Sequence, residues 1–308
     1  MRIIAIYGPT AVGKSRVAVA VARALDGEIV SADSMQVYRG IPVITDQPPA
    51  ELLAAAPHHL VGFLPLDEEY SAARFVEDAR VVMEQISGRG RLPVLVGGTG
   101  LYIRALLGDF SFAGTDEDAR RYWEGYIEEN GCRAALARLR ELDPAAAAAT
   151  DHANPRRLVR ALEAAAAGVP VTAERERLWS AGLSRDTKSF ALELPRDELY
   201  ARIDERVYAM LSGGAVEEVA AALGGPLSRT ASQAIGIAEI KAFLAGRQSL
   251  EETAVAIRQK SRNYAKRQLT WMRKMPDIAR IDVSGLTPEE AAAQIVNHVR
   301  SGNGASST

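Results

Sequence analysis

The chain of 308 residues contains a single cysteine, Cys132, so no disulfide can form within it and nothing in the sequence requires an oxidising compartment. No motif surrounds Cys132, and we interpret it as a packing residue rather than a nucleophile. The longest apolar run near the start, Ile3 to Tyr7, is too short for the core of a signal peptide or for a membrane span. These absences lead us to expect a cytoplasmic protein with no membrane partner.

The sequence also lacks a strong charge of either sign, with 37 Lys and Arg against 39 Asp and Glu and a net charge of −2. Such a balance neither indicates nor excludes a nucleic-acid partner, because local clusters of charge matter more than their sum. Hydrophobic residues make up 47% of the chain, as in an ordinary globular protein. The length allows a core domain together with a second, smaller one.

Strand and helix patterns alternate in the first hundred residues. Residues 2–7 (RIIAIY) form an uninterrupted stretch rich in β-branched residues, and residues 28–31 and 92–96 also have strand character. Between these strands, residues 15–25 and 71–86 carry apolar side chains at helical spacing. Alternation of this kind predicts an α/β fold, in which a parallel sheet is flanked by helices.

The composition changes near Gly114. From there to about Gly182 the chain is rich in Ala, Arg and Glu, with no convincing strand, which predicts an inserted all-helical domain. The segment FALELP (190–195) is expected to return to the sheet, and four further helices are expected at 197–211, 214–223, 232–245 and 250–274. The predicted divisions are a catalytic core at 1–112 and 184–280, an insertion at 113–183, and a partly disordered tail at 281–308.

The stretch GPTAVGKS has the pattern G-x-x-x-x-G-K-[ST] between a predicted strand and a predicted helix. Backbone N–H groups and the helix N-terminus of such a loop form a nest for phosphate. Lys14 adds a positive charge, and the Ser15 hydroxyl is a candidate Mg²⁺ ligand. The alternative, a glycine-rich turn that arose by chance, lacks the strand–loop–helix context found here. The predicted diphosphate-binding residues are Gly8, Pro9, Thr10, Ala11, Val12, Gly13, Lys14 and Ser15.

A nucleotide kinase or NTPase usually holds Mg²⁺ with a further acid at the end of another core strand. Here the strand LPVLV ends in GGTG, which has no acid, whereas Asp33 follows the strand at 28–31. Asp33 is therefore predicted at the carboxyl edge of the sheet, where ligands of such folds bind. The alternative role for Asp33 is to cap a turn or a helix. The pattern argues against an ATPase.

Residues 256–275 hold seven basic residues and no acid. Arg258, Arg262 and Lys266 recur every four residues, and Tyr264 and Trp271 belong to a packing stripe on the opposite face. Such a concentration of positive charge in a nearly neutral protein favours a polyanionic partner. A second basic group lies at 156–160. The alternative is a solvated charged face, in which acids would normally be interspersed.

Eight blocks together resemble the tRNA dimethylallyltransferase family, also called tRNA isopentenyltransferases or IPP transferases. They are GPTAVGKS, SADSMQVYRG, PHHL, EEYSAARFVEDA, LVGGTGLYIRALL, NPRRLVRALE, QAIGIAEI and YAKRQLTWMR, in that order from about residue 3 to 275. The resemblance implies a P-loop NTPase-like core with a helical insertion. It also implies transfer of the dimethylallyl group of dimethylallyl diphosphate to N6 of an adenosine beside the anticodon, with Mg²⁺ as cofactor and diphosphate as product.

The resemblance also implies roles for individual residues. Asp33 matches the aspartate that engages the adenine amine, Thr99 a threonine near the reacting groups, and Arg206 an arginine that binds the diphosphate. The tRNA anticodon stem-loop is the implied partner of a monomeric enzyme. The implied tRNA-contacting residues are Asp33, Ser34, Met35, Gln36, Arg156, Arg157, Leu158, Val159, Arg160, Gln233, Ala234, Ile235, Gly236, Lys266, Arg267, Gln268, Trp271 and Arg273.

The chain departs from the family pattern in places. IPVITDQPP stands where a stretch close to MDIGTAKP is usual, and Ile237 and Ser261 replace a tyrosine and a threonine. The details of tRNA contact therefore stay open. Three other functions also stay open: an isopentenyltransferase that modifies free adenine nucleotide, a P-loop kinase of small molecules, and an RNA-binding P-loop protein without catalytic activity.

Overall fold

The computed structural model describes residues 1–108, 117–168, 186–275 and 277–301. The chain divides into two compact units, one formed by Met1–Leu107 and Leu183–Thr308 and the other by Gly108–Gly182. The second unit therefore interrupts the sequence of the first, at boundaries within a few residues of those predicted for the insertion. Within the described residues, no helix combines the length and apolar character that a membrane span needs.

The first unit is built on a six-stranded parallel sheet with the strand order β3-β2-β4-β1-β5-β6. Its strands are β1 (Ile3–Tyr7), β2 (Gly27–Ala32), β3 (His58–His59), β4 (Leu92–Gly97), β5 (Thr187–Glu193) and β6 (Ile278–Asp282). The four central strands fall close to the strands expected from the sequence, and the predicted α/β fold is confirmed.

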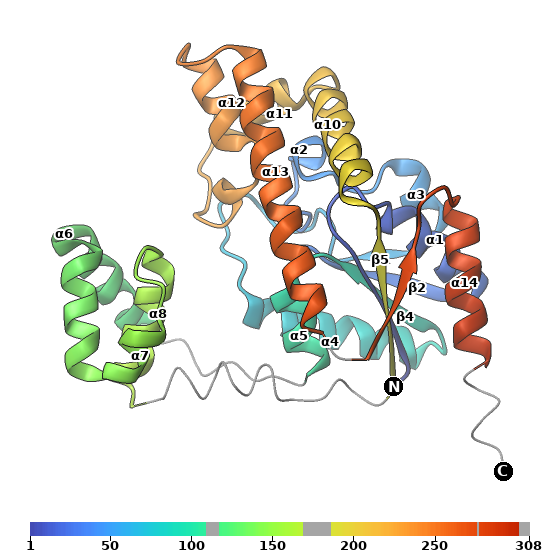
Figure 1. Cartoon of the computed structure of the whole chain (residues 1–308), viewed down its shortest axis with the longest axis horizontal. Helices are drawn as coiled ribbons and strands as arrows, with labels where there is room; N and C mark the ends of the chain where they lie inside the picture. Colours follow the sequence, from blue (N-terminus) through green and yellow to red (C-terminus); the bar gives the residue numbers. More distant parts are fainter. Residues whose placement is uncertain (109–116, 169–185, 276, 302–308) are drawn as a thin grey trace. The chain divides into compact units, whose positions relative to one another are not determined.

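The helices of this unit cover the sheet (Figure 1). They are α1 (Lys14–Ala24), α2 (Pro42–Thr45), α3 (Ala50–Ala55), α4 (Ala72–Gly88), α5 (Gly100–Leu107), α10 (Arg196–Ser212), α11 (Ala215–Ala222), the 3-10 helix η1 (Ala231–Gln233), α12 (Ile237–Leu244), α13 (Leu250–Arg273) and α14 (Pro288–Ser301). On one face α1 and α14 pack together, and on the other α4 packs against α5.

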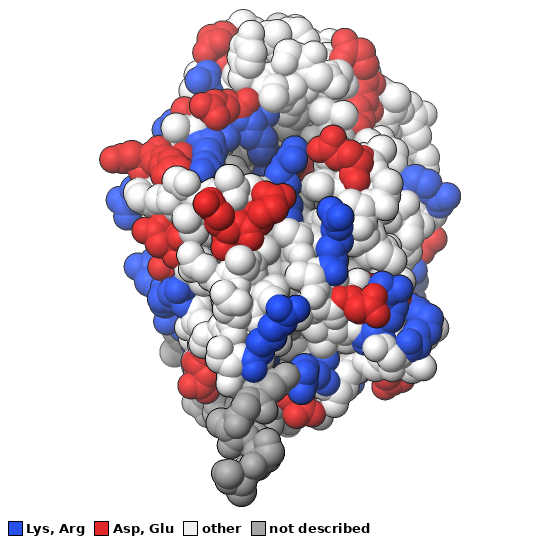
Figure 2. Space-filling view, turned by 90° about the vertical axis from the view of Figure 1, so that its right-hand side faces the viewer, with Lys and Arg blue, Asp and Glu red and all other residues white. Residues whose placement is uncertain are grey.

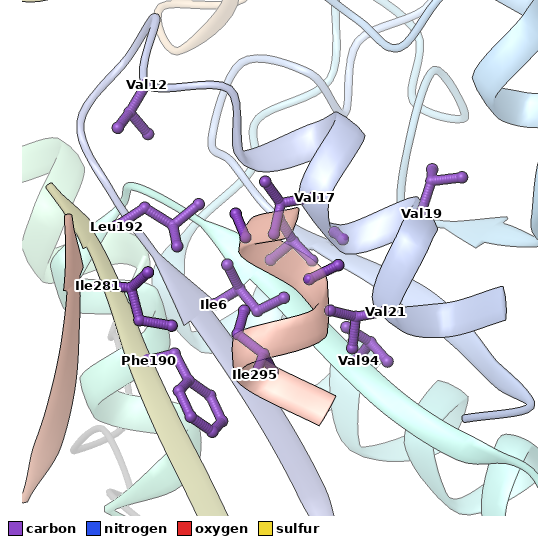
Figure 3. Close-up of a cluster of buried hydrophobic side chains, with 14 of the residues drawn as sticks. Ile6, Val12, Val17, Val19, Val21, Val94, Phe190, Leu192, Ile281 and Ile295 are labelled. Carbon is purple, nitrogen blue, oxygen red and sulfur yellow. The ribbon is translucent and has the colours of Figure 1, made fainter. Parts of the chain in front are cut away.

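The main hydrophobic cluster joins α1 and α14 to alternate residues of the central strands and to the edge strand β6. Figure 3 shows Ile6 of β1, Phe190 of β5 and Ile281 of β6 converging with Val17 of α1 and Ile295 of α14. Ile6 and Ile295 have no exposed surface. The cluster fixes the helix that follows the phosphate loop against the sheet, so the position of the loop depends on the core and not on the loop alone.

The segment 281–301 is part of this core and not a tail. Ile281 lies in β6, which pairs with β5, and α14 buries Ile295 and Val299. The predicted division, which ended the core at residue 280, therefore stopped short of these residues, and residues 302–308 lie outside those described. A local signal was present, because Thr287 caps the helix and Glu290 bonds back to the Thr287 N–H at 2.8 Å, as in a capping box.

The helix expected at 232–245 is interrupted. The turn η1 ends at Gln233, and α12 begins only after Gly236, whose φ of +112° favours glycine. The Gly236 N–H donates to the Glu239 carboxylate at 3.0 Å, which compensates for the break in the helix. The left-handed backbone at Gly236 separates the two pieces.

The second unit contains only helices in its described part: α6 (Glu117–Leu142), α7 (Pro144–Ala149) and α8 (Pro155–Ala166). Gly131 kinks α6, with φ of +78° and ψ of +165°. Leu139 of α6 and Leu158 and Leu162 of α8 are fully buried in the unit's own hydrophobic cluster. This separate core allows the unit to be treated as a domain of its own.

Candidate active site at the carboxyl edge of the sheet

Three loops leave the sheet side by side because their strands end in register. Tyr7 of β1 pairs with Gly97 of β4, and Gly97 pairs in turn with Ala32 of β2. The phosphate loop, the Asp33 loop and the GGTG turn follow those residues directly. Parallel strands therefore bring three sequence motifs, far apart in the chain, to one edge of the sheet.

These loops open into a cavity of about 1010 Å³. Loop residues Thr10, Lys14 and Asp33 line it together with Arg206 of α10 and Tyr264 of α13. Its other side is largely apolar and comes from the segment around α2 and α3. The cavity thus combines a phosphate-binding loop, a carboxylate and an apolar wall, and every lining residue belongs to the first unit.

The phosphate loop adopts the backbone that an anion nest requires. Ala11 and Gly13 have positive φ values of +65° and +96°, and α1 begins at Lys14. The Lys14 ammonium donates to the Pro9 carbonyl at 2.7 Å, which directs it over the loop. Of the predicted diphosphate-binding residues, Thr10, Ala11, Gly13, Lys14 and Ser15 line the cavity, whereas Gly8, Pro9 and Val12 are buried beneath it.

The pKa of Lys14 is lowered to about 8, chiefly by burial and also by the Arg206 guanidinium, while the Asp33 and Asp46 carboxylates oppose the shift. Lys14 is thus a lysine whose proton is held less tightly than usual until an anion is present. Two cations and two carboxylates share this part of the cavity, so its charge is nearly balanced in the free protein.

Asp33 caps the turn after β2 and also lines the cavity. Its Oδ1 accepts hydrogen bonds from the N–H groups of Met35 and Gln36 at 2.9 and 3.3 Å, which caps the turn after β2. Those are the hydrogen bonds of this carboxylate within the described chain, and both engage Oδ1. The turn thus holds Oδ1 of this lining residue, and Oδ2 takes no part in the turn.

Thr99 supports the Asp33 loop rather than lining the cavity. Its Oγ1 accepts a hydrogen bond from the Ser34 N–H at 3.3 Å. Burial, together with the Asp33 charge, raises the pKa of Tyr264. Tyr264 was assigned to a packing stripe from the sequence, but it lines the cavity beside Asp33. Its helical phase alone could not reveal this.

Arg206 reaches the phosphate loop from α10. Its guanidinium donates to the Thr10 hydroxyl, and Nη1 lies 3.1 Å from Oδ2 of Asp46. Residue Asp46 follows the short helix α2 and was not singled out from the sequence. The predicted diphosphate ligand Arg206 is therefore beside the loop, and its charge is balanced by a carboxylate on the opposite wall.

The helix α13 is bound to two of the loops through its YAKRQLTW block. Gln268 is buried and accepts a hydrogen bond from the Thr10 N–H at 2.8 Å, and a Cβ at Gly98 would collide with its amide. A Cβ at Gly100 would lie 2.6 Å from the Trp271 ring. Gln268 and Trp271, predicted to contact tRNA, thus hold α13 against the loops, and the glycines of GGTG allow this close approach.

Replacing Gly100 by alanine should lower the free energy of unfolding by about 1–3 kcal/mol, because the added methyl group overlaps Trp271. Gly88 is the matched control, because a Cβ there meets nothing within 4 Å and it also lies in a helix. Gly88→Ala should leave stability unchanged or raise it by up to about 1 kcal/mol. Urea unfolding followed by circular dichroism measures both. Equal effects would show that the contact with Trp271 is unimportant.

The basic residues of α13 divide into two groups. Arg262 pairs with Asp204 of α10 and lies over the Tyr200 ring, so it joins two helices. Arg267 lies over the Tyr264 ring, 5.5 Å from its centroid, and lines the cavity. The side chains of Lys266 and Arg273 are exposed. Arg262 is thus primarily a structural residue that joins α13 to α10. Of the basic face predicted from the sequence, Lys266 and Arg273 are exposed to a partner.

The QAIG segment lies at the cavity, with Gln233, Ala234 and Ile235 in its lining and Gly236 buried. In the second unit, α8 exposes Arg156 and Arg157 and half-buries Arg160. The side chains of Leu158 and Val159 are 0% and 5% exposed, so they pack in the core of that unit rather than presenting a surface to a partner. The helical repeat directs them inward from between exposed arginines.

The chain matches the family model described as IPP transferase over residues 36–275 and the isopentenyl transferase model over residues 1–57. A tRNA dimethylallyltransferase of Anaeromyxobacter dehalogenans is 46% identical over 284 residues, covering 89% of this chain and 92% of that protein. The corresponding protein of Geobacter sulfurreducens is 43% identical over 282 residues, covering 90% of each chain.

Solved structures of tRNA-modifying prenyltransferases have a similar fold over nearly the whole chain. The tRNA isopentenylpyrophosphate transferase of Bacillus halodurans is similar with a TM-score of 0.72 and 36% identity, covering 97% of this chain and 96% of that one. A eukaryotic dimethylallyltransferase acting on tRNA is similar with a TM-score of 0.79 and 26% identity, covering 97% of this chain and 80% of that one. Such proteins have a P-loop NTPase-like fold, as predicted from the sequence.

Proposed function

Because the chain belongs to the IPP transferase family, we propose that it transfers the dimethylallyl group of dimethylallyl diphosphate to N6 of the adenosine beside the anticodon of tRNA. The observation that carries the proposal is that Lys14, Arg206 and Asp33 line one cavity. A cation pair beside a phosphate loop suits a departing diphosphate, and a carboxylate close by suits a nucleophile that must lose a proton.

In the donor half of the site, the allylic C–O bond breaks and its electron pair leaves with the diphosphate. Negative charge therefore grows on the phosphate oxygens in the transition state. The Lys14 ammonium and the Arg206 guanidinium both lie at the phosphate loop, so they are placed to stabilise that charge. The phosphate loop is thus proposed to hold a leaving group rather than a phosphate that is transferred.

In the acceptor half, the exocyclic amine of adenine attacks the allylic carbon and a new N–C bond forms. The amine is a weak nucleophile, because its lone pair is delocalised into the ring. Asp33 is proposed to take the amine proton through Oδ2 while Oδ1 stays bonded to the turn. The base must leave its stack to reach this carboxylate, which suits a single-stranded anticodon loop.

We also propose Mg²⁺ as a cofactor bound together with the diphosphate. The described residues contain no cluster of three or more His, Cys, Asp or Glu, which fits an ion held largely by phosphate and water with one or two protein oxygens. The Ser15 hydroxyl, at the start of α1 on the cavity wall, would hold it. Bound there, the ion would supply further positive charge to the leaving group.

The acceptor is proposed to bind along α13 and through α8. Lys266 and Arg273 are exposed on the helix that borders the cavity, and Arg156, Arg157 and Arg160 lie on α8 of the second unit. By contrast, acidic and basic side chains are interspersed over the face drawn in Figure 2, where α14 lies. Phosphate contacts of this kind give affinity that depends on salt.

Replacing Lys266 and Arg273 together by glutamine should weaken tRNA binding and reduce the slope of log affinity against log salt by about one for each phosphate that the protein no longer neutralises. The control is Arg23→Gln with Arg300→Gln, which removes two exposed charges from α1 and α14. Filter binding at several salt concentrations measures the slope. If both double variants reduce the slope equally, Lys266 and Arg273 contribute only to the net charge of the protein and not to a specific contact with tRNA.

Affinity for inorganic diphosphate should fall as pH rises above about 8. A bound anion raises the pKa of Lys14 above its value in the free protein, so protonated Lys14 contributes fully below pH 8 and is lost as pH rises through the raised value. Calorimetric titration of wild type and Lys14→Arg from pH 7 to 10 separates this effect from ionisation of the ligand itself. Parallel pH profiles would exclude Lys14 as its source.

The activity is tested by incubating the protein with dimethylallyl diphosphate, Mg²⁺ and either unmodified tRNA or AMP. Mass analysis of the tRNA nucleosides should show a dimethylallyl adenosine, and diphosphate should be released. Transfer to AMP alone would identify an adenylate isopentenyltransferase. Phosphoryl transfer from ATP would identify a kinase, and tRNA binding without diphosphate release an RNA-binding protein.

The enzyme is proposed to act as a monomer in the cytoplasm. Support for a monomer comes from the cavity, whose lining is drawn from one compact unit of one chain. Light scattering after gel filtration tests the oligomeric state.

A further inference from the structure

The segment that departs most from the family pattern, IPVITDQPP, supplies a carboxylate to the donor half of the site. Asp46 ends α2 in the left-handed conformation, with φ of 56° and ψ of 47°. Its side chain is 55% exposed and lies on the cavity wall, with Oδ2 3.1 Å from Nη1 of Arg206. This guanidinium nitrogen is also the one that donates to Thr10 in the phosphate loop.

Neighbouring elements hold Asp46 in this position. The Glu218 carboxylate of α11 accepts hydrogen bonds from the N–H groups of Val43 and Ile44 at 2.8 and 2.7 Å, which anchors the start of α2. At its other end, the Asp46 carbonyl accepts a hydrogen bond from the Gln36 amide at 2.6 Å. The backbone of Asp46 is thus fixed from both sides, while its side chain keeps the freedom to turn toward solvent.

The position of the carboxylate has a consequence for ligand binding. Arg206 is the predicted diphosphate ligand, and a carboxylate oxygen already lies beside its Nη1 where a phosphate oxygen would bind. A carboxylate and a phosphate close to the same cation also repel each other. Asp33 differs, because it is bonded to its own turn and no ion pair with Arg206 is observed in the described structure.

We propose that Asp46 is a positioning residue that holds Arg206 in the free enzyme and is exchanged for the diphosphate when the donor binds. The same exchange in reverse, with Asp46 returning to Arg206, promotes release of the diphosphate product. This inference rests on the proposed function, because it assigns the anion at Arg206 to the diphosphate. It makes Asp46 a determinant of how tightly donor and product are held.

The test is Asp46→Asn, which keeps the size of the side chain and removes its charge. Affinity for inorganic diphosphate in the presence of Mg²⁺, measured by calorimetry, should rise about threefold to tenfold. In an Arg206→Met background the same substitution should change affinity by at most about twofold, because there is no ion pair to exchange. In turnover, the rate with excess substrate should fall while the single-turnover rate stays the same, because product release becomes slower.

The matched control is Glu51→Gln. Glu51 pairs with Arg16 at 3.3 Å on the surface, so this variant removes one carboxylate and leaves the Arg206 pair intact. An equal rise in diphosphate affinity in both variants would overturn the proposal, because it would show that the net charge of the protein and not the Arg206 pair governs this affinity. Weaker diphosphate binding in Asp46→Asn would overturn it in favour of a ligand role for the carboxylate. If wild type neither binds diphosphate nor transfers the prenyl group, the proposed function fails; if it does both and Asp46→Asn behaves like wild type, only this inference fails.

Discussion

Replacing Asp33 by asparagine should lower the single-turnover rate of prenyl transfer by about 10²–10⁴-fold, the range that a positioned general base contributes. Asparagine keeps an oxygen that can accept the Met35 and Gln36 N–H groups, so the turn after β2 is preserved while the charge is lost. Affinity for inorganic diphosphate should change little. The measurement is rapid-quench kinetics at saturating enzyme, with tRNA nucleosides analysed by mass.

The comparison with Asp33→Ala separates the two roles of this residue. Alanine removes the proton acceptor and also the cap on the turn, so it should be slower still and less stable to heat than Asp33→Asn. A rate for Asp33→Asn within a few-fold of wild type would contradict the assignment of Asp33 as the base. In that case the role of Asp33 would be structural, as the cap on the turn after β2.

Replacing Lys14 by methionine should lower kcat/KM for dimethylallyl diphosphate by about 10²–10³-fold. Lys14 is held over the phosphate loop by the Pro9 carbonyl, where the charge of the leaving diphosphate grows. Both the affinity for the donor and the rate of the chemical step should therefore decrease. Steady-state kinetics with varied donor at saturating tRNA measures kcat and KM.

Arg23→Met is the control for Lys14→Met. It removes one positive charge from the same helix, but its side chain is exposed at the far end of α1. Its kcat/KM should stay within about threefold of wild type, as for most exposed charges. A loss of similar size in both variants would mean that the net charge of α1, and not the ammonium of the loop, governs donor binding.

The parts of the site that could be predicted are those with a local signal. The glycines and Lys14 of the phosphate loop, and Asp33 at the end of a buried strand, can be identified from a few neighbouring residues. The ion pair of Asp46 with Arg206 has no such signal, because it joins a turn to a helix 160 residues away in the chain. Arg262 shows the converse, since its spacing indicated an RNA contact while Asp204 and Tyr200 hold it to α10.

The elements of the fold that could be predicted are likewise those with a local signal in the sequence. The strands β1 and β4 are continuous apolar runs, and the sequence located all four central strands to within a few residues. The edge strand β6 is short and only partly buried, and its pairing with β5 bridges almost ninety residues of sequence, as the Ser189–Ile278 register shows. The strand β3 contains only His58 and His59, too few residues for any periodic pattern.

The hydrogen bond between the Thr10 N–H and Gln268 links the two proposed substrate sites. Thr10 belongs to the loop proposed to bind the donor, and Gln268 to the helix whose exposed side presents Lys266 and Arg273. Under this proposal, a donor that shifts the loop changes the free energy of the helix that binds tRNA. Linkage requires the effect to be reciprocal, so the factor by which donor changes the affinity for tRNA equals the factor by which tRNA changes the affinity for donor.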